Sequence, residues 1–136
     1  MTSDETEELR PFLRDNVSSF EELETLLFFV RAPRGVWSAA DVAPAVRLPE
    51  EAIETALDAL VKAGNFLQQA MGADGRRGYR LASSEETLRL LETLRRAYDE
   101  ERVRVMQIMT SNALERVRSA AARRLADAFR LGRGKK

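Results

Sequence analysis

The sequence predicts a mainly α-helical protein in which three helices and a small β-hairpin precede long C-terminal helices. Apolar residues recur at steps of three and four along most of the chain, and capping residues precede several of these stretches. The spacing of the apolar residues becomes typical of β-strands only around residues 65–82. A length of 136 residues suits one domain with a helical extension.

Residues 1–18 form an acidic N-terminal segment, in which Leu9, Phe12 and Leu13 have the spacing of one short helical turn packed on the body. The start of the chain lacks the basic and then apolar pattern of a secretory signal. The longest apolar run, residues 26–30, is far too short to cross a bilayer. We therefore expect a cytoplasmic protein without membrane insertion.

Three short helices are expected next, each with its own start signal. The first two begin with a serine three residues before an acidic residue, and the third has proline at its start and glycine at its end. The signals and expected ranges are Ser19 with Glu22 for residues 19–31, Ser38 with Asp41 for residues 38–46, and Pro49 with Gly64 for residues 49–63.

Two short strands follow, over residues 65–70 and 78–82. The segment between them contains Asp74-Gly75, a pair typical of hairpin turns. Residues 36–37 are long enough for a single sheet bridge. A hairpin is therefore expected directly after the third helix.

The C-terminal part, residues 83–131, is interpreted as a helical arm opened by a capping box at Ser83. Residues 110–112 interrupt the apolar pattern, so we expect two helices, 84–109 and 113–130, with a hinge between them. Residues 132–136 are expected to be a flexible basic tail.

The first arm helix would extend about 39 Å, which is longer than a small domain is wide. Its apolar stripe therefore requires cover from a second subunit or from the second arm helix folding back. We expect the protein to be a homodimer, and the predicted interface residues are Leu91, Leu94, Tyr98, Val105, Ile108 and Met109.

The pattern of a short helix, Leu-Pro, a helix ending in Leu-x-x-Leu-x-x-x-Gly and then a hairpin resembles the winged-helix domain of small bacterial regulators of the MarR and PadR type. The resemblance covers residues 19–82. It is carried by Trp37–Val42, Leu48–Ile53, Leu57–Gly64 and Tyr79–Leu81. It implies a dimeric, DNA-binding transcription regulator whose third helix enters the major groove while the hairpin, or wing, touches the DNA backbone.

The third helix departs from that pattern in its charge. Its outward positions carry four acids and one base, and exposed acids oppose binding to phosphates. These residues are Glu50, Glu51, Glu54, Asp58 and Lys62. This acidic face favours an alternative function, a winged-helix adaptor that binds a protein and does not touch DNA.

The overall charge is balanced, but residues 1–30 carry eight acids and two bases, whereas residues 101–136 carry ten bases and three acids. The acidic head and basic tail can pair with each other, or the tail can meet an external polyanion. Candidate nucleic-acid contacts are the hairpin residues Arg76, Arg77 and Arg80 and the arm residues Arg116, Arg123 and Arg130. The amphipathic helix that carries the arm residues also suits a protein groove.

The chain has neither histidine nor cysteine, which excludes nucleophile–histidine catalysis and zinc sites of the Cys/His type. Its acids lie on expected solvent-facing helix surfaces, and it has no Gly-rich phosphate loop. We therefore expect neither an enzyme nor a cofactor.

Overall fold

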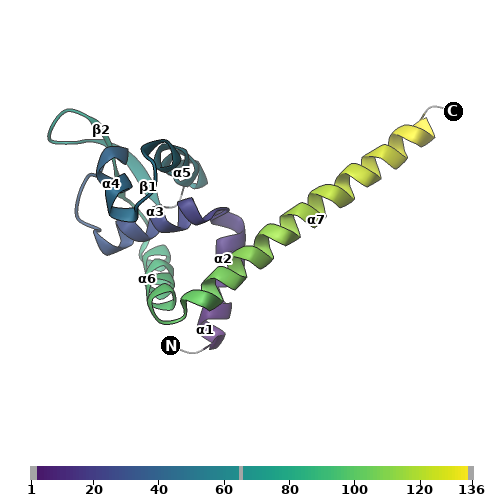
Figure 1. The fold of residues 1–136 in the computed structure, drawn as a ribbon, viewed down its shortest axis with the longest axis horizontal. Helices are drawn as coiled ribbons and strands as arrows, with labels where there is room; N and C mark the ends of the chain where they lie inside the picture. The colour runs from purple at the N-terminus through teal and green to yellow at the C-terminus, as the bar shows by residue number, and fades with distance from the viewer. Residues whose placement is uncertain (1–2, 65, 135–136) are drawn as a thin grey trace.

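The computed structural model describes residues 3–64 and 66–134, and it shows a mainly helical chain with one two-stranded antiparallel sheet. A body of short helices and the hairpin gathers at one end, and one long helix leaves it (Figure 1). The elements are α1 Ser3–Glu7, α2 Leu9–Asn16, α3 Phe20–Arg31, α4 Ala39–Val46, α5 Glu50–Ala63, β1 Leu67–Met71, β2 Arg77–Leu81, α6 Glu85–Glu100 and α7 Arg102–Gly134.

The acidic N-terminal segment is part of the core. It forms two helices, α1 and α2, where the sequence predicted one short turn. Leu9 and Leu13 are completely buried, and α2 packs against α7. Thr6 is also buried, which the acidic composition of this segment did not suggest.

The three expected helices form α3, α4 and α5, and their local signals act as predicted. Ser19 caps α3 through the backbone N–H of Glu22, and Ser38 forms a complete capping box with Asp41 at the start of α4. Pro49 is the N-cap of α5 and therefore lies one position before the first helical residue. The left-handed C-caps are Arg47 of α4 and Gly64 of α5.

The hairpin pairs Leu67 with Leu81 and Met71 with Arg77, so its strands lie within two residues of the expected ranges. Asn65, the start of the predicted first strand, lies outside the described residues. The single bridge predicted at residues 36–37 is confirmed, because Trp37 exchanges two backbone hydrogen bonds of 2.9 Å with Tyr79.

A close approach requires a glycine at position 78 of β2. A Cβ atom there would lie 2.6 Å from Cγ1 of Val36, well inside van der Waals contact. The indole N–H of Trp37 donates to the carbonyl of Ala32, and the ring meets Phe28 edge-on. Trp37 thus joins the hairpin to α3.

The C-terminal helices divide at a different point from the one predicted. The helix breaks at Glu101, whose φ of −135° leaves helical geometry and whose carboxylate accepts a hydrogen bond from Thr6 of α1. The predicted hinge at residues 110–112 is wrong. Asn112 stays helical, and its buried amide donates to the carbonyl of Arg10 at 3.2 Å.

Two further expectations need correction at the ends of this region. Ser84 caps α6 in place of Ser83, through the N–H of Thr87. The predicted flexible tail is helical as far as Gly134, while residues 135–136 lie outside the described part.

The predicted dimer-interface residues lie inside the single chain, so their apolar stripe is covered without a second subunit. All six are at most 4% exposed, because the turn at Glu101 folds α7 back against the body and α1 and α2 cover it. These residues are Leu91, Leu94, Tyr98, Val105, Ile108 and Met109.

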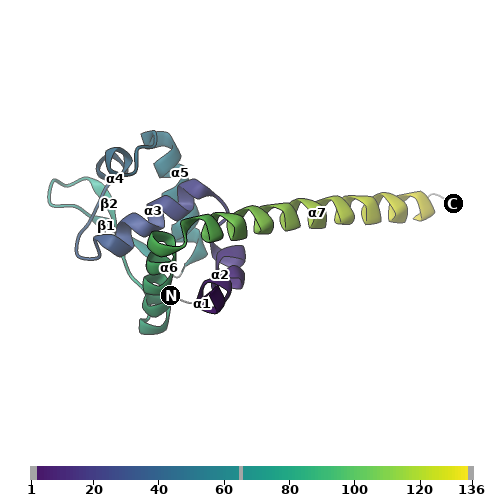
Figure 2. The ribbon, with the colours of Figure 1, turned by 60° about the horizontal axis from the view of Figure 1, so that its bottom comes forward.

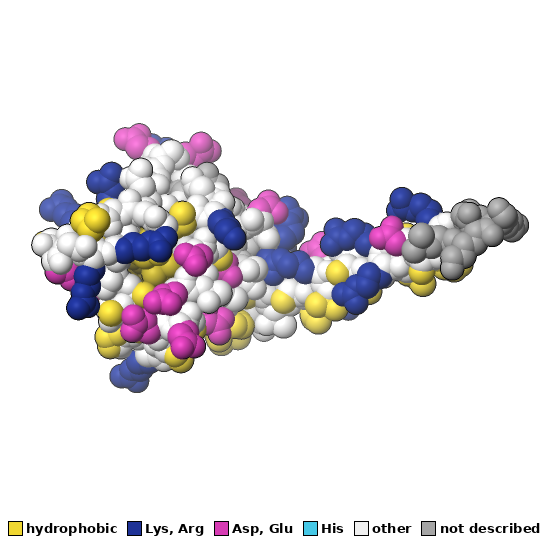
Figure 3. Space-filling view, turned by 90° about the horizontal axis from the view of Figure 1, so that it is seen from above, with side chains coloured by type: hydrophobic (Ala, Val, Ile, Leu, Met, Phe, Trp, Pro, Cys, Tyr) yellow, Lys and Arg dark blue, Asp and Glu magenta, His cyan; other side chains and the backbone are white. Residues whose placement is uncertain are grey.

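Beyond its first turns, α7 runs clear of the body in both ribbon views (Figures 1 and 2). It contains 33 residues, a length of about 50 Å. Its inner face, with Val105 and Ile108, packs on the body, whereas Val103 and Leu114 on its outer side are exposed. In Figure 3, hydrophobic side chains follow one edge of the extended helix.

Candidate functional site

The hairpin carries three of the predicted nucleic-acid contacts, and hydrogen bonds fix its tip. Gly75 has a φ of 78°, in the left-handed region that glycine adopts readily. The carboxylate of Asp74 accepts from the N–H of Arg76 at 3.0 Å, and the N–H of Gly72 donates to the carbonyl of Arg76 at 2.8 Å. The turn therefore presents Arg76 at a defined position beyond the helices.

The three hairpin arginines do not share one surface. Strand alternation places Arg77 on the face of Tyr79 and Arg80 on the opposite face. Arg80 donates to the side-chain oxygen of Gln68 at 2.8 Å, across the two strands. The described residues provide no hydrogen-bond or ion-pair partner for the Arg77 side chain, which is the least engaged of the three.

Arg76 and Arg77 line one wall of a cleft whose opposite wall is the outward face of α5. The cleft has a volume of about 330 Å³, and Glu50, Glu54 and Asp58 contribute carboxylates to it. All three acids are exposed, as the helical spacing predicted. A phosphate that approaches the arginines from this side meets negative charge as well, which lowers its affinity.

The N-terminus of α4 closes one end of the same cleft. The N–H of Ser38 donates to the carboxylate of Asp41 at 2.9 Å, and the N–H of Asp41 donates to the hydroxyl of Ser38 at 3.2 Å. The hydrogen bonds from Ser38 to its carboxylate lower the pKa of Asp41, and Arg76 adds a smaller electrostatic contribution. Asp41 is therefore ionised at neutral pH and adds to the acids beside the cleft.

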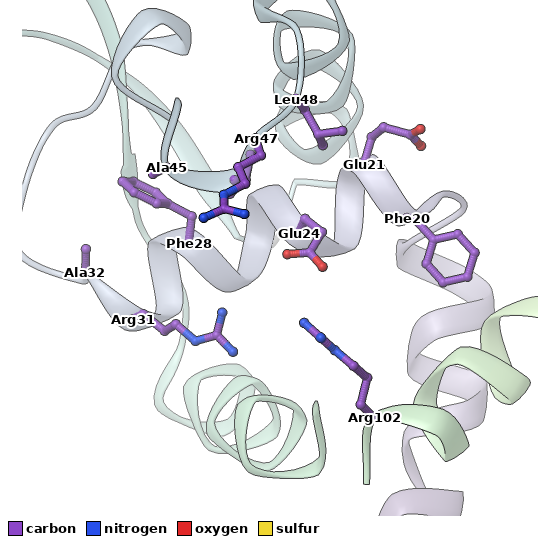
Figure 4. A pocket seen from close by; sticks show the side chains of 11 residues that line it. Phe20, Glu21, Glu24, Phe28, Arg31, Ala32, Ala45, Arg47, Leu48 and Arg102 are labelled. Atoms are coloured by element: carbon purple, nitrogen blue, oxygen red, sulfur yellow. The ribbon is translucent and has the colours of Figure 1, made fainter. Parts of the chain in front are cut away.

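A second pocket, of about 490 Å³, brings three arginines together from different parts of the chain (Figure 4). They are Arg31 at the end of α3, Arg47 after α4, and Arg102 at the start of α7. Arg31 forms an ion pair of 2.7 Å with Asp99, and Arg102 lies 4.6 Å from the centre of the Tyr98 ring. The guanidinium groups of Arg31 and Arg102 are therefore already engaged by other residues of the protein.

The residues beneath this pocket form a polar network that the sequence did not reveal. The hydroxyl of Tyr98 donates to the carboxylate of Glu24, and burial raises the pKa of Tyr98 above its usual value. Glu24 and Arg102 are 78 positions apart and line the same pocket because the chain turns back at Glu101, between α6 and α7. No spacing pattern in the sequence signals that these two residues line one pocket.

The arm arginines lie along α7, which extends away from the hairpin (Figure 1). Arg116 is engaged with the body, because its guanidinium donates to the carbonyl of Arg14 at 2.8 Å. Arg130 pairs with Asp127 at 3.1 Å, and Arg123 is exposed. One chain therefore does not join its hairpin and arm arginines into a continuous basic surface.

Comparison with protein families, curated proteins and solved structures gives no match to this chain. Within residues 3–64 and 66–134, no group of three or more acidic side chains is arranged to hold a metal ion. No helix in that described part is long and apolar enough to span a membrane.

Proposed function

We propose that residues 19–82 form a winged-helix domain that binds double-stranded DNA, and that the protein acts as a dimeric transcription regulator. The observation that carries the proposal is the arrangement of α4, α5 and the hairpin. Residues 47–49 alone separate the two helices, as in helix-turn-helix units. The hairpin follows α5 and projects past both helices with arginines at its tip (Figure 1).

The charges define the mode of binding. The acidic outer face of α5 opposes close approach to phosphates, so the proposed contacts come from Arg76 and Arg77, with Arg80 on the other face of the wing. Phosphate contacts position a protein on DNA but do not read its sequence. The proposed complex is therefore mainly electrostatic and weakly sequence-selective.

The test is a titration of random duplex at two salt concentrations, with wild type and the double variant Arg76→Ala/Arg77→Ala. Removing two phosphate contacts should weaken binding to all sequences alike and reduce the salt slope by about two. The matched control is Arg89→Ala/Arg96→Ala, which removes the same charge from exposed positions on α6. The control should bind more tightly than the hairpin variant.

A second candidate, the protein-binding adaptor, is favoured by one specific observation. The carboxylates of Glu50, Glu51, Glu54 and Asp58 on α5 are all exposed, and they form no ion pair within the described residues. They provide a ready surface for a basic partner protein. Wild-type protein that retains no duplex at low salt would refute DNA binding and favour this adaptor function.

A further inference from the structure

The pocket of about 490 Å³ against α3 holds opposite charges that the chain does not pair with each other. Glu24 forms no ion pair within the described residues, although three arginines line the same pocket. The carboxylate of Glu24 and the three guanidinium groups point into one common space (Figure 4). A ligand that fills this space can therefore contact charges of both signs. The arginines are Arg31, Arg47 and Arg102.

Arg47 is the pocket arginine that the protein itself uses least. Residues 3–64 and 66–134 offer its side chain no hydrogen-bond or ion-pair partner. Its φ of 60° is left-handed, and no other non-glycine residue in those ranges has a positive φ. Backbone strain of this kind is concentrated at functional sites. From the turn between α4 and α5, the strained residue directs its guanidinium over α3 and into the pocket (Figure 4).

The charges that line the pocket balance each other. Arg31 is already neutralised by its ion pair of 2.7 Å with Asp99. The other charged residues of the lining are two arginines and two glutamates, namely Arg47, Arg102, Glu21 and Glu24. A ligand of one sign gains little from a pocket that is neutral overall. A zwitterion gains from both signs, because its carboxylate pairs with guanidinium and its ammonium group with carboxylate.

The rest of the lining is apolar. Edge-on contacts with Phe29 and Trp37, each with ring centres 5.5 Å apart, hold the ring of Phe28 in place. Small-molecule pockets usually have volumes of about 300–1,000 Å³, so this pocket has room for an apolar group beside the charged ones. The apolar lining residues are Phe20, Phe28, Ala32, Ala45, Val46 and Leu48.

We propose that this pocket binds a free amino acid with a large apolar side chain. Arg47 and Arg102 hold the carboxylate, and Glu24 holds the ammonium group. The apolar side chain of the ligand lies against Phe28 and the rest of the apolar lining.

The contacts that Glu24 and Arg102 already make are compatible with this ligand. Glu24 accepts the Tyr98 hydroxyl, and a carboxylate has acceptor sites for further donors. Arg102 lies 4.6 Å from the centre of the Tyr98 ring, and its five N–H donors leave some for a carboxylate. Tyr98 therefore positions both charged groups before the ligand arrives, which reduces the cost of binding.

Isothermal titration calorimetry of the full chain tests the ligand class. L-Phenylalanine and L-leucine should bind, whereas analogues of phenylalanine that lack one feature should bind at least about tenfold more weakly. The analogues are 3-phenylpropionate without the amino group, phenylalaninamide without the carboxylate, and glycine without the side chain. Absence of binding by both amino acids at millimolar concentrations would overturn the proposal. Equal binding of 3-phenylpropionate would overturn it too, because the site would then accept any organic anion.

The variant Arg47→Gly separates ligand binding from a structural role. It relieves the positive φ and should unfold at a higher temperature, yet it should bind L-phenylalanine at least about tenfold more weakly. The control Arg34→Gly removes the same charge from an exposed loop residue outside the pocket and should bind as wild type does. Undiminished binding by Arg47→Gly would refute the proposed site.

The variant Glu24→Gln tests the ammonium contact. Glutamine keeps an oxygen that can accept the Tyr98 hydroxyl but loses the negative charge. The preference of wild type for L-phenylalanine over 3-phenylpropionate should therefore disappear, and an unchanged preference would contradict a zwitterion site. None of these measurements involves DNA, so their outcome is independent of the proposed DNA binding.

Discussion

Replacing Leu13 by alanine should destabilise the whole protein, although this residue lies in an acidic segment that resembles a loosely attached end. Its side chain is completely buried, and α2 packs it into the core beside α7. Deletion of a fully buried leucine side chain costs about 3 kcal/mol of unfolding free energy, through lost burial and the cavity left behind. That is a large part of the roughly 5–15 kcal/mol that stabilises a domain.

The assay is urea unfolding followed by circular dichroism. With a slope near 2 kcal/mol per molar urea, a loss of about 3 kcal/mol lowers the midpoint by about 1.5 M. The matched control is Leu88→Ala on α6, where the same truncation removes a side chain that is 39% exposed. Its midpoint should fall far less.

Equal midpoints for the two leucine variants would refute the conclusion that α2 belongs to the core. Hydrogen exchange adds a local measure, because the inner face of α7 packs on α2. Amides around Val105 and Ile108 should lose protection in Leu13→Ala. Unchanged protection there would contradict the packing of α7 on the N-terminal helices.

Three smaller effects follow from the caps of α4. Ser38→Ala removes the capping hydroxyl and should cost about 1 kcal/mol of stability, measured by the urea midpoint. The pKa of Asp41 is lowered in the folded state, so its ionised carboxylate stabilises the fold at neutral pH, and this stabilisation is lost as the pH falls below about 4. The variant Asp41→Asn should therefore lose less stability on acidification than wild type. Arg47 has a φ of 60°, and Arg47→Gly should raise the thermal midpoint by relieving about 1 kcal/mol of strain, whereas a lower midpoint would contradict it.

The body elements that the sequence predicted well are those whose signals lie within a few residues. Ser19 and Ser38 cap helices through neighbouring N–H groups, and Gly64 ends α5 in the left-handed conformation. The hairpin also follows from its local turn, with Gly75 at positive φ. Such signals act before tertiary contacts form, so one sequence suffices to read them.

The C-terminal helices could not be divided correctly because the deciding contacts are distant in the chain. Thr110-Ser111-Asn112 interrupts the apolar pattern, yet the side-chain NH2 group of Asn112 donates to the carbonyl of Arg10, from the other end of the protein. Glu101 carries no breaking signal of its own, and its partner Thr6 is 95 positions away. Helical spacing alone does not contain this information.

In the candidate site too, features with local signals were predicted and features that depend on distant contacts were not. Exposure of the acidic face of α5 follows from its apolar period and was predicted correctly. The hydrogen bond of Arg116 to the carbonyl of Arg14 was not predicted, because it forms only where α2 ends beside α7. A basic residue on an amphipathic helix looks the same in sequence whether it meets a phosphate or its own backbone.

Two apolar patterns coexist on α7, and both have helical spacing. Val105 and Ile108 belong to the buried pattern, and Val103 and Leu114 belong to the exposed one. Successive residues on a helix are rotated by about 100°, so the contacts that fix the inner face also fix the direction of the outer face. The hydrogen bonds of Asn112 and Arg116 to α2 set that rotation at two points. They therefore also fix which side of α7 faces away from the body.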